Sequence, residues 1–257
     1  MVALVLALQW LVVAVAPFVP RAWEEPLGRV AFEQILRSHP RCEREPGRQA
    51  LDAIVERLRP GFPANVPIDV QVVRGDVVNA LALPGGTIVI FDGLLRRVRS
   101  PDEVAGVLAH EVAHIADRHT TAALLRVVGV SVIVRLVLGS SAGAQVGGGL
   151  LELSNTRAAE EEADRDGVGL LRRVGVRPDG LALFFARLER EGLDADGLPA
   201  MLSTHPPTAA RRAAVSMGAG ENAGEAVLSI EEWRALRKIC PRAGLRKYRA
   251  AGPATRP

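Results

Sequence analysis

The chain of 257 residues is 48% hydrophobic and 24% charged, which is typical of a globular protein and sufficient for one catalytic domain with a substantial core. Its formal net charge is +3, but the basic residues are scattered among acids and form no stripe with aromatic residues. This pattern excludes a nucleic-acid-binding surface as the main function, so no nucleic-acid partner is expected.

Residues 1–20 are almost wholly apolar. Their length suits a signal peptide and is marginal for a membrane span, and Ala14-Val15-Ala16 offers small residues for cleavage. No basic residue precedes the run, whereas Arg21 follows it, an order that favours a cytoplasmic domain by the positive-inside rule. Length and apolarity outweigh this objection. We therefore expect a signal peptide or membrane anchor and a location in the cell envelope, periplasmic or membrane-anchored.

Residues 21–62 form the expected N-terminal helical region. Apolar residues recur there at helical spacing, which predicts one or two amphipathic helices. We expect His39-Pro40 and Pro46-Gly47 to interrupt them, because proline and glycine are the strongest local breaks in a helical pattern.

Three strand candidates follow, at Ile68–Val73, Val77–Leu83 and Thr87–Phe91. They are rich in β-branched residues and are separated by the short connections 74–76 and 84–86. Because connections this short join neighbouring antiparallel strands, the pattern predicts a small antiparallel meander.

A helix is predicted from Pro101 to Arg118, because Ser100 suits an N-cap and Glu103 completes a capping box. The apolar run at residues 122–151 leaves two interpretations open. It is either a hydrophobic helical excursion that touches a membrane surface or covers the active site, or an ordinary buried helix pair. Further helices are predicted at Ala158–Val174, Pro178–Glu191 and Ile230–Ile239, and a short one opens at His205–Thr208.

The two cysteines, Cys42 and Cys240, lie near opposite ends of the chain. They lack the C-x-x-C spacing of a structural zinc site. They form either a disulfide, in an oxidising compartment, or two unrelated buried thiols, and the sequence favours neither alternative.

The most informative residues are His110-Glu111-Val112-Ala113-His114. On a helix, residues four apart share a face, so both imidazoles can bind one cation, and imidazole nitrogen suits Zn²⁺. Glu111 is rotated from them by one residue, and can take a proton from a metal-bound water whose pKa zinc lowers to about 7. The motif therefore predicts one zinc ion per chain and Glu111 as the catalytic base.

The third metal ligand is predicted on a second helix. A metzincin would have Gly and His where Asp117 and Thr120 stand, which excludes that class. Glu160 and Asp164 lie four residues apart on one face of a predicted helix. Glu160 can thus bind the metal while Asp164 holds a ligand histidine from behind.

Neighbouring polar residues receive other interpretations. Glu161 points away from the ligand face and is expected on a solvated acidic surface, whereas Glu162 is ambiguous and can pair with Arg157 or Arg165. His119 lies five residues beyond the second histidine of the motif. On a continuous helix it turns away from the metal, so it is predicted to be structural.

Four motifs in chain order resemble metallopeptidase family forty-eight: the strand Asn79–Gly86, the zinc motif His110–His114, the segment Glu160–Asp164 and Thr204-His205-Pro206. The resemblance covers about Val66–Ala214. The family includes HtpX-type, CAAX prenyl and BepA-like periplasmic peptidases. The single N-terminal apolar segment is similar to the periplasmic branch, which implies a bacterial envelope protein.

The resemblance implies three properties of the site. It implies a gluzincin, in which Glu160 completes the zinc site. It implies that Asn79-Ala80-Leu81-Ala82 is a strand with which an extended substrate peptide pairs. It also implies that His205 approaches the metal, where it either stabilises the oxyanion or occupies the open metal position and keeps the enzyme latent.

The predicted fold is α+β, a gluzincin-type zinc peptidase with a small antiparallel sheet packed against the zinc-motif helix and a second ligand-bearing helix. The predicted organisation is a signal peptide or anchor at 1–20, a helical region at 21–62, a zinc metallopeptidase domain at 63–218 and a C-terminal helix and tail at 219–257.

The predicted function is zinc-dependent hydrolysis of peptide bonds in unfolded or misfolded proteins, as part of cell-envelope quality control. A membrane surface is a further candidate partner. Two alternatives remain: a zinc-binding, client-holding chaperone without proteolysis, and a membrane-embedded prenyl-protein peptidase.

Overall fold

A computed structural model of the protein describes residues 18–64, 66–126, 155–191, 201, 204–205 and 225–241. Most of the predicted export segment, most of the apolar run at 122–151 and the helix expected to open at His205 lie outside these residues. Among the helices that are described, none combines the length and the apolarity needed to cross a bilayer.

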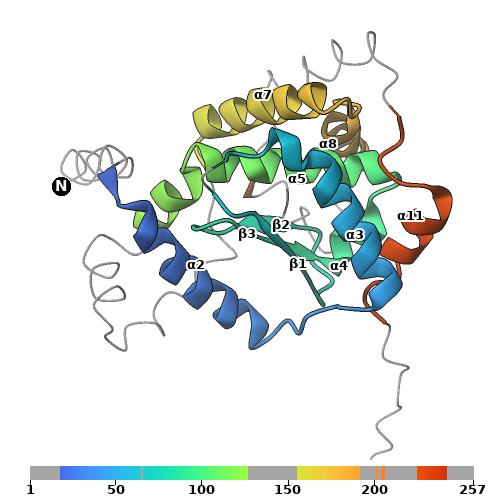
Figure 1. Ribbon diagram of the computed structural model, residues 1–257, viewed down its shortest axis with the longest axis horizontal. Helices are drawn as coiled ribbons and strands as arrows, with labels where there is room; N and C mark the ends of the chain where they lie inside the picture. The colour runs from blue at the N-terminus through green and yellow to red at the C-terminus, as the bar shows by residue number, and fades with distance from the viewer. Residues whose placement is uncertain are drawn as a thin grey trace, which may run out of the picture.

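The described part is rich in helices around one small sheet (Figure 1). In chain order, its elements are α2 (Arg21–Leu36), α3 (Glu45–Leu58), the 3₁₀ helix η2 (Arg59–Gly61), β1 (Asp69–Val73), β2 (Ala80–Ala82), β3 (Thr87–Phe91), α4 (Asp92–Arg97), α5 (Pro101–Ala116), α7 (Arg157–Arg173), α8 (Gly180–Glu191) and α11 (Ile230–Leu236).

The sheet has the strand order β1-β3-β2 and is mixed, so the predicted antiparallel meander is wrong. β2 pairs with β3 in antiparallel fashion, as expected, across the turn at 84–86. Gly85 and Gly86 have φ values of 83° and 105°, a region of backbone space that favours glycine. β1, however, runs parallel to β3, with Asp69 opposite Thr87 and Val73 opposite Phe91.

The connection after β1 explains this difference. The N–H of Gly75 donates to Asp92 Oδ1 at 2.7 Å, and the carbonyl of Gly75 accepts from the N–H of Gly93 at 2.9 Å. These bonds attach residues 74–76 to the start of α4, at the end of β3, instead of closing a hairpin. The chain then reaches the other side of β3, where the strand β2 is only Ala80–Ala82 rather than the predicted Val77–Leu83.

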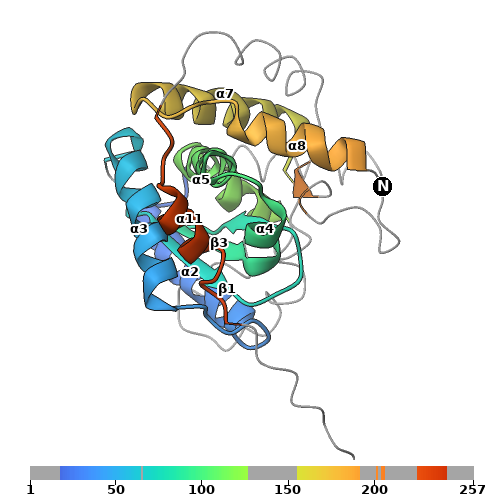
Figure 2. The ribbon, with the colours of Figure 1, turned by 90° about the vertical axis from the view of Figure 1, so that its right-hand side faces the viewer.

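The sheet is buried on both faces, which explains the uninterrupted apolar sequence of β3. Ile88 and Ile90 belong to the core shared with α3 and α5, whereas Val89 and Phe91 belong to the core shared with α2. Figure 2 shows the resulting layers, with α7 and α8 on the side of α5 that faces away from the sheet. α5 is therefore the central helix of the molecule.

The N-terminus of α5 is held by its cap and by a buried ion pair. Ser100 Oγ accepts from the N–H of Glu103 at 3.2 Å, as predicted. Glu103 also receives two hydrogen bonds from Arg187 of α8, at 2.6 and 2.7 Å, and both side chains are buried. Paired charges of this kind are tolerated in a core, and they fix α5 relative to α8.

Several helix boundaries differ from the predicted ones by a few residues. α3 begins at Glu45, so Pro46-Gly47 lies in its first turn and does not interrupt it. A proline is tolerated there because the first helical N–H groups have no partner within the helix. α5 ends at Ala116, short of the predicted Arg118. This last difference affects the functional site.

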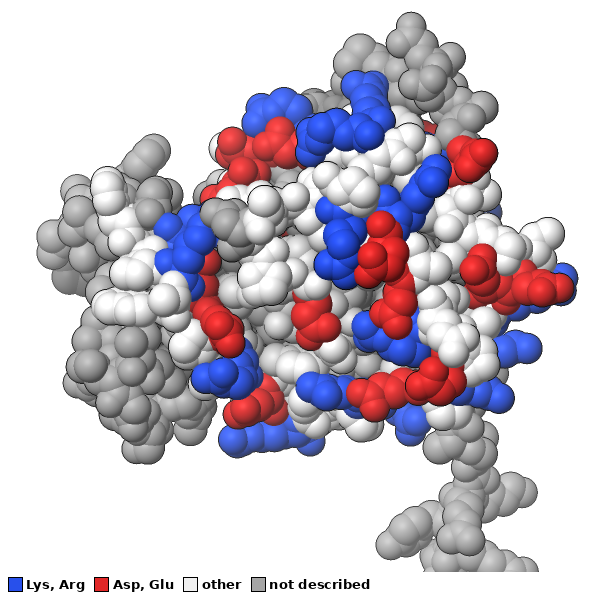
Figure 3. All heavy atoms as spheres, in the orientation of Figure 1, with Lys and Arg blue, Asp and Glu red and all other residues white. Residues whose placement is uncertain are grey.

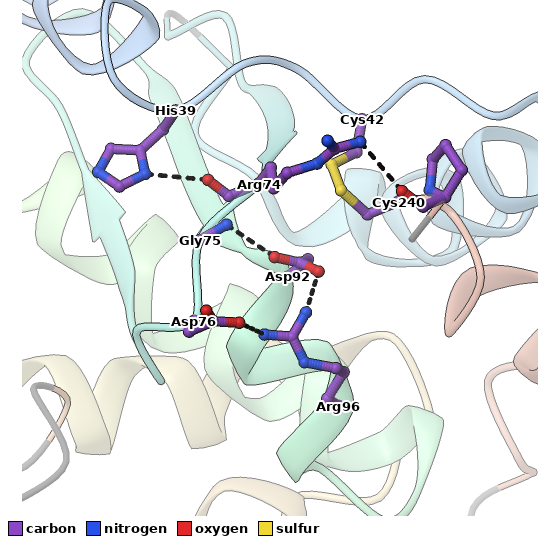
Figure 4. Close-up of a disulfide and its surroundings, with 9 residues drawn as sticks. His39, Cys42, Arg74, Gly75, Asp76, Asp92, Arg96 and Cys240 are labelled. Atoms are coloured by element: carbon purple, nitrogen blue, oxygen red, sulfur yellow. Dashed lines mark hydrogen bonds and ion pairs between the residues drawn. A yellow bond between two sulfur atoms is a disulfide. The ribbon is translucent and has the colours of Figure 1, made fainter. Parts of the chain in front are cut away.

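The two cysteines form a disulfide, Cys42–Cys240, which settles the alternative that the sequence left open (Figure 4). Their Cα atoms lie 4.6 Å apart. The bond joins the segment before α3 to the segment after α11, and Arg74 adds a hydrogen bond of 3.0 Å to the carbonyl of Pro241. The C-terminal helix is thereby fastened to the end of β1.

Charges of both signs are interspersed on the face shown in Figure 3. Charged side chains of the described residues are often paired locally, as in Arg48–Asp52, Arg59–Glu56 and Arg97–Glu191, each at 2.6 Å. The excess of basic residues therefore does not gather into one patch on this face.

Candidate metal centre and active site

The two histidines of the zinc motif lie on one face of α5 and are completely buried. Their Nε2 atoms are 3.0 Å apart. Glu160, in the first turn of α7, faces both of them, with carboxylate oxygens 3.3 Å from His110 Nε2 and 3.3 Å from His114 Nε2. The structure thus brings together the three predicted metal ligands from two packed helices.

His205 completes this cluster. Its Nδ1 lies 3.1 Å from Glu160 Oε2 and 3.2 Å from His110 Nε2, and its side chain is also buried. The potential ligand atoms of the four residues all lie within 4.8 Å of one another. The approach of His205 to the metal site was expected from the family resemblance alone, since the surrounding sequence has no pattern that indicates it.

Asp164 lies behind the first ligand, where the sequence placed it. Its Oδ1 is 2.9 Å from His110 Nδ1, on the side of the ring opposite to the cluster. Glu160 and Asp164 are four residues apart on α7, so one helix supplies both a potential metal ligand and a carboxylate that contacts another potential ligand from behind.

Glu111 points into the space beside the cluster and not at its centre. Its Oε2 accepts a hydrogen bond of 2.8 Å from the N–H of Ala82 in β2, and its Oε1 lies 3.5 Å from His205 Nε2. Burial raises the pKa of Glu111, although the facing imidazoles of His205 and His110 act in the opposite direction. The carboxylate is thus held by the sheet in a position suited to proton transfer.

Within the cluster, neighbouring residues strongly affect the pKa values of His110, His114 and Glu160. Burial lowers the pKa of His110, but its hydrogen bonds to Asp164 and Glu160 outweigh this effect and raise the pKa to about 9. Burial, together with the neighbouring His110, lowers the pKa of His114 to about 3. Burial opposes ionisation of Glu160, yet the facing imidazoles hold the pKa of this carboxyl well below its ordinary value.

The residues of the predicted substrate strand lie beside Glu111, but not all of them are accessible. β2 lies at one edge of the sheet that the described strands form. Asn79, just before it, is buried, and its side-chain oxygen accepts from Ala80 N–H at 3.0 Å and from Thr204 Oγ1 at 3.3 Å. Asn79 therefore fastens the segment carrying His205 to the sheet, a role that the sequence did not indicate.

The orientation of His119 differs from the predicted one. Its Nδ1 lies 3.0 Å from His114 Nδ1, and its Nε2 lies 3.3 Å from Glu162 Oε2. The prediction assumed a continuous helix, whereas α5 ends at Ala116 and a new helical segment starts at residue 119. Glu162 also pairs with Arg165 at 3.4 Å, one of its two predicted partners, and Glu161 is exposed as expected.

Asn155 is a further residue that the sequence analysis did not single out. Its Nδ2 lies 3.3 Å from His114 Nε2, and it lines a cavity of about 30 Å³ together with Leu81, Ala82, Glu111 and His205. This volume corresponds to about one water molecule. The site as described is therefore narrow, and His205 forms part of its wall.

The donor set fits a metal ion. Buried ionisable groups are tolerated only when they are paired or bind a cation, and this cluster contains four of them. Two imidazoles, a carboxylate and a further imidazole from separate segments are nitrogen and oxygen donors of the kind that bind zinc. The space between these donors is formed by Nε2 of both α5 histidines and by both oxygens of Glu160.

A helix-borne histidine pair, an intervening glutamate and a further carboxylate from a second helix, as the third potential ligand, define the class as a metallopeptidase. The profile of Peptidase family M48 matches residues 47–218, well over half of the chain, and the chain belongs to this family. The predicted family, and with it the predicted enzyme class of metalloendopeptidase, is confirmed.

Named relatives agree with this assignment. A beta-barrel assembly-enhancing protease of Yersinia pestis is 33% identical over 159 residues, which are 54% of this chain and 32% of that protein. The mitochondrial metalloendopeptidase OMA1 of Arabidopsis thaliana is 37% identical over 142 residues, 54% of this chain and 29% of that protein. The metalloprotease LoiP of Escherichia coli is 29% identical over 155 residues, 56% of this chain and 60% of that protein. The chain spans about a third of the length of the assembly-enhancing proteases that it matches.

Proposed function

We propose that the chain is a zinc-dependent endopeptidase of the gluzincin type that cleaves unfolded or misfolded proteins in the bacterial cell envelope. The observation that carries the proposal is the buried group of His110, His114 and Glu160 with the carboxylate of Glu111 beside it. One zinc ion per chain is held by the first three residues. When bound, this ion would act as a Lewis acid and would lower the pKa of a water molecule bound to it to about 7.

Glu111 is the proton carrier in this mechanism. Ala82 N–H fixes Oε2, which leaves Oε1 to take the proton of the attacking water and to return it to the leaving amine. Burial raises the pKa of Glu111, which favours proton acceptance, and the charge of a bound metal ion would act in the opposite direction. Asp164 holds His110 from behind and keeps its Nε2 directed inward.

His205 has two candidate roles, as stabiliser of the oxyanion or as a group that occupies the open metal position. The second is favoured by its Nδ1, which lies among the ligand atoms, 3.1 Å from Glu160 and 3.2 Å from His110. Movement of the segment carrying Thr204 and His205 away from Asn79 would open the site. The proposal therefore includes a latent state held by His205.

Substrate pairing along Ala80–Ala82 is part of the proposal. β2 is at the sheet edge and next to Glu111, which suits the addition of an extended peptide as a further strand. The N–H groups of Ala80 and Ala82 already donate to Asn79 and Glu111. A bound peptide consequently pairs with the N–H of Ala80 only if its bond to Asn79 is exchanged, whereas the bond from Ala82 is kept and holds Glu111.

The envelope location is supported by the disulfide and by the relatives. Disulfides persist in oxidising compartments such as the periplasm, and the Cys42–Cys240 bond closes most of the chain into one loop. The name of the Yersinia pestis relative connects it with the assembly of beta-barrel proteins. Misfolded envelope proteins are the substrate class that we propose on these grounds.

The test compares cleavage of unfolded casein by the zinc-loaded full chain, its Glu111→Gln variant and a Glu161→Gln control. We expect Glu111→Gln to bind zinc normally and to lose about 10²–10⁴-fold in rate, because it removes the proton acceptor. Glu161→Gln, an exposed change one residue from a ligand, should retain the wild-type rate. Removal of zinc by a chelator should abolish all cleavage, and readdition should restore it.

Three outcomes bear on this assignment. Full activity in Glu111→Gln would contradict the proposed base. If zinc-loaded wild type does not cleave but His205→Ala does, His205 keeps the enzyme latent. If neither cleaves although both bind zinc, the client-holding chaperone becomes the better interpretation.

A further inference from the structure

The two histidines of α5 are held from outside by different groups. His110 Nδ1 faces a carboxylate directly, Asp164 Oδ1 at 2.9 Å. His114 Nδ1 faces another imidazole, His119 Nδ1 at 3.0 Å, and the far side of that ring faces Glu162 Oε2 at 3.3 Å. The His114 side therefore has a chain of two outer groups where the His110 side has one.

The carboxylate at the end of this chain fixes where the protons lie. Ionised Glu162 only accepts hydrogen bonds, so His119 must donate through Nε2–H. A neutral imidazole then carries a lone pair on Nδ1, which accepts from Nδ1–H of His114. His114 is left with a lone pair on Nε2, the atom that faces Glu160 and His110. This is the tautomer that binds a metal ion through Nε2.

The backbone break after α5 places His119 in this position. Arg118 has φ 59°, a left-handed conformation that is uncommon for a residue other than glycine. Its guanidinium is held by Glu24, with Nε donating to Oε1 at 2.8 Å, and Thr121 Oγ1 donates to the same oxygen at 2.6 Å. Contacts with the buried Glu24 of α2 thus support a turn that directs His119 back towards α5.

We propose that His119 and Glu162 are positioning residues that fix the tautomer and orientation of His114 as a metal ligand. The proposal rests on the proposed metal site. It assigns His119 the function for His114 that Asp164 has for His110. The contribution of His119 should exceed that of Glu162, because the His119 side chain is 12% exposed and that of Glu162 is 47% exposed.

The test measures zinc affinity of the full chain by competition with a chromophoric chelator. In His119→Asn the side-chain oxygen occupies the place of Nδ1 and can still accept from His114 Nδ1–H, whereas His119→Leu has a similar volume and no acceptor. We expect His119→Leu to bind zinc about 10–100-fold more weakly, the usual effect of losing an outer partner of a ligand. His119→Asn should recover most of this loss.

Glu162→Ala provides a second test on a half-exposed residue whose removal leaves the core intact. It should weaken zinc binding less than His119→Leu does, and Glu161→Ala, its exposed neighbour, should leave the affinity unchanged. Thermal unfolding of the zinc-free variants separates a positioning role from a structural one. If His119 had a purely structural role, its replacement would lower the stability, and His119→Asn would not recover the zinc affinity lost in His119→Leu.

Each outcome is decisive. Equal zinc affinities for wild type, His119→Leu and Glu162→Ala would overturn the inference while leaving the peptidase assignment intact. Equal losses in His119→Asn and His119→Leu would also overturn it, because only packing would then matter. Zinc binding that follows the expected order supports the inference even if neither the wild type nor His205→Ala cleaves casein, an outcome that would contradict the proposed function alone.

Discussion

The two faces of α7 each carry a glutamate and other charged residues, but they have different surroundings and different roles. The face towards α5 has Glu160, Asp164 and Gly167, all buried, while the face towards solvent has Glu161 and Arg165, both exposed. Adjacent glutamates therefore differ completely in their surroundings. Position on the helix decides which carboxylate belongs to the metal site, and the residue type alone does not.

The buried face is built at helical spacing. Glu160, Asp164 and Gly167 follow one another at intervals of four and three residues, so they lie along one line of the helix surface. Glu160 faces the ligand histidines, Asp164 faces the back of His110, and Gly167 lets the two helix backbones come close together. These three residues therefore fix three different features of the site: the carboxylate that faces the histidines, the contact behind His110 and the distance between the two helices.

The largest effect is expected from the matched pair Glu160→Gln and Glu161→Gln. The first replaces a charged ligand by a neutral amide in a fully buried site, so zinc affinity should fall by more than the roughly 100-fold that marks the loss of an outer partner. Casein cleavage should disappear with it. The second changes the same group on the exposed face and should alter neither property.

Titration with zinc and assay of casein cleavage distinguish the two variants. If Glu160→Gln bound zinc as tightly as the wild type, the third ligand would have to be another residue, and His205 would be the first candidate because of its 3.2 Å approach to His110. A loss in Glu161→Gln would show that the two faces are not independent.

The helical spacing of α5 and α7 made most of the site predictable from the sequence. His110 and His114 share a face because they are four residues apart, and the same holds for Glu160 and Asp164. Local rules of this kind need only a continuous helix. His119 was misplaced because the helix is not continuous: Arg118 takes a conformation usually given to glycine, and its support comes from a distant glutamate.

The sheet was predictable as three strands but not in its topology. Loop length favoured a hairpin after β1, yet Gly75 donates a hydrogen bond to Asp92 and accepts one from Gly93, and these bonds redirect the chain. Pairing of Cys42 with Cys240 depends equally on tertiary proximity. His205 and Asn79 were found only through the family resemblance, because contacts across the fold, not local spacing, define their roles.

Gly167→Ala should produce an intermediate effect, because it acts on the distance between α5 and α7. A Cβ at this position would lie 3.1 Å from the backbone nitrogen of His110 and 3.2 Å from the carbonyl carbon and oxygen of Ala109. Backbone atoms cannot turn aside as a side chain can, so the helices must separate slightly. Overpacking of this kind costs about 1–3 kcal/mol of the free energy of unfolding.

The same displacement moves Glu160 and Asp164 away from His110, so zinc affinity should fall together with stability. Denaturant unfolding of the zinc-free protein measures the first effect, and chelator competition measures the second. A variant that loses stability but keeps the wild-type zinc affinity would show that the site adjusts to the helix spacing, contrary to the geometry described above.

Gly169→Ala should have the smallest effect, with the opposite sign. Position 169 is on the same helix, but among the described residues its Cβ would meet only the guanidinium of Arg173, at 3.4 Å. The added methyl group therefore fits, and alanine is favoured over glycine inside a helix by up to about 1 kcal/mol. We expect a rise in Tm of about 2–4 °C for a chain of this size, with unchanged zinc affinity. If Gly169→Ala were destabilised, this face of α7 would have to be covered in the intact protein. The two faces of α7 would then no longer differ in burial as described.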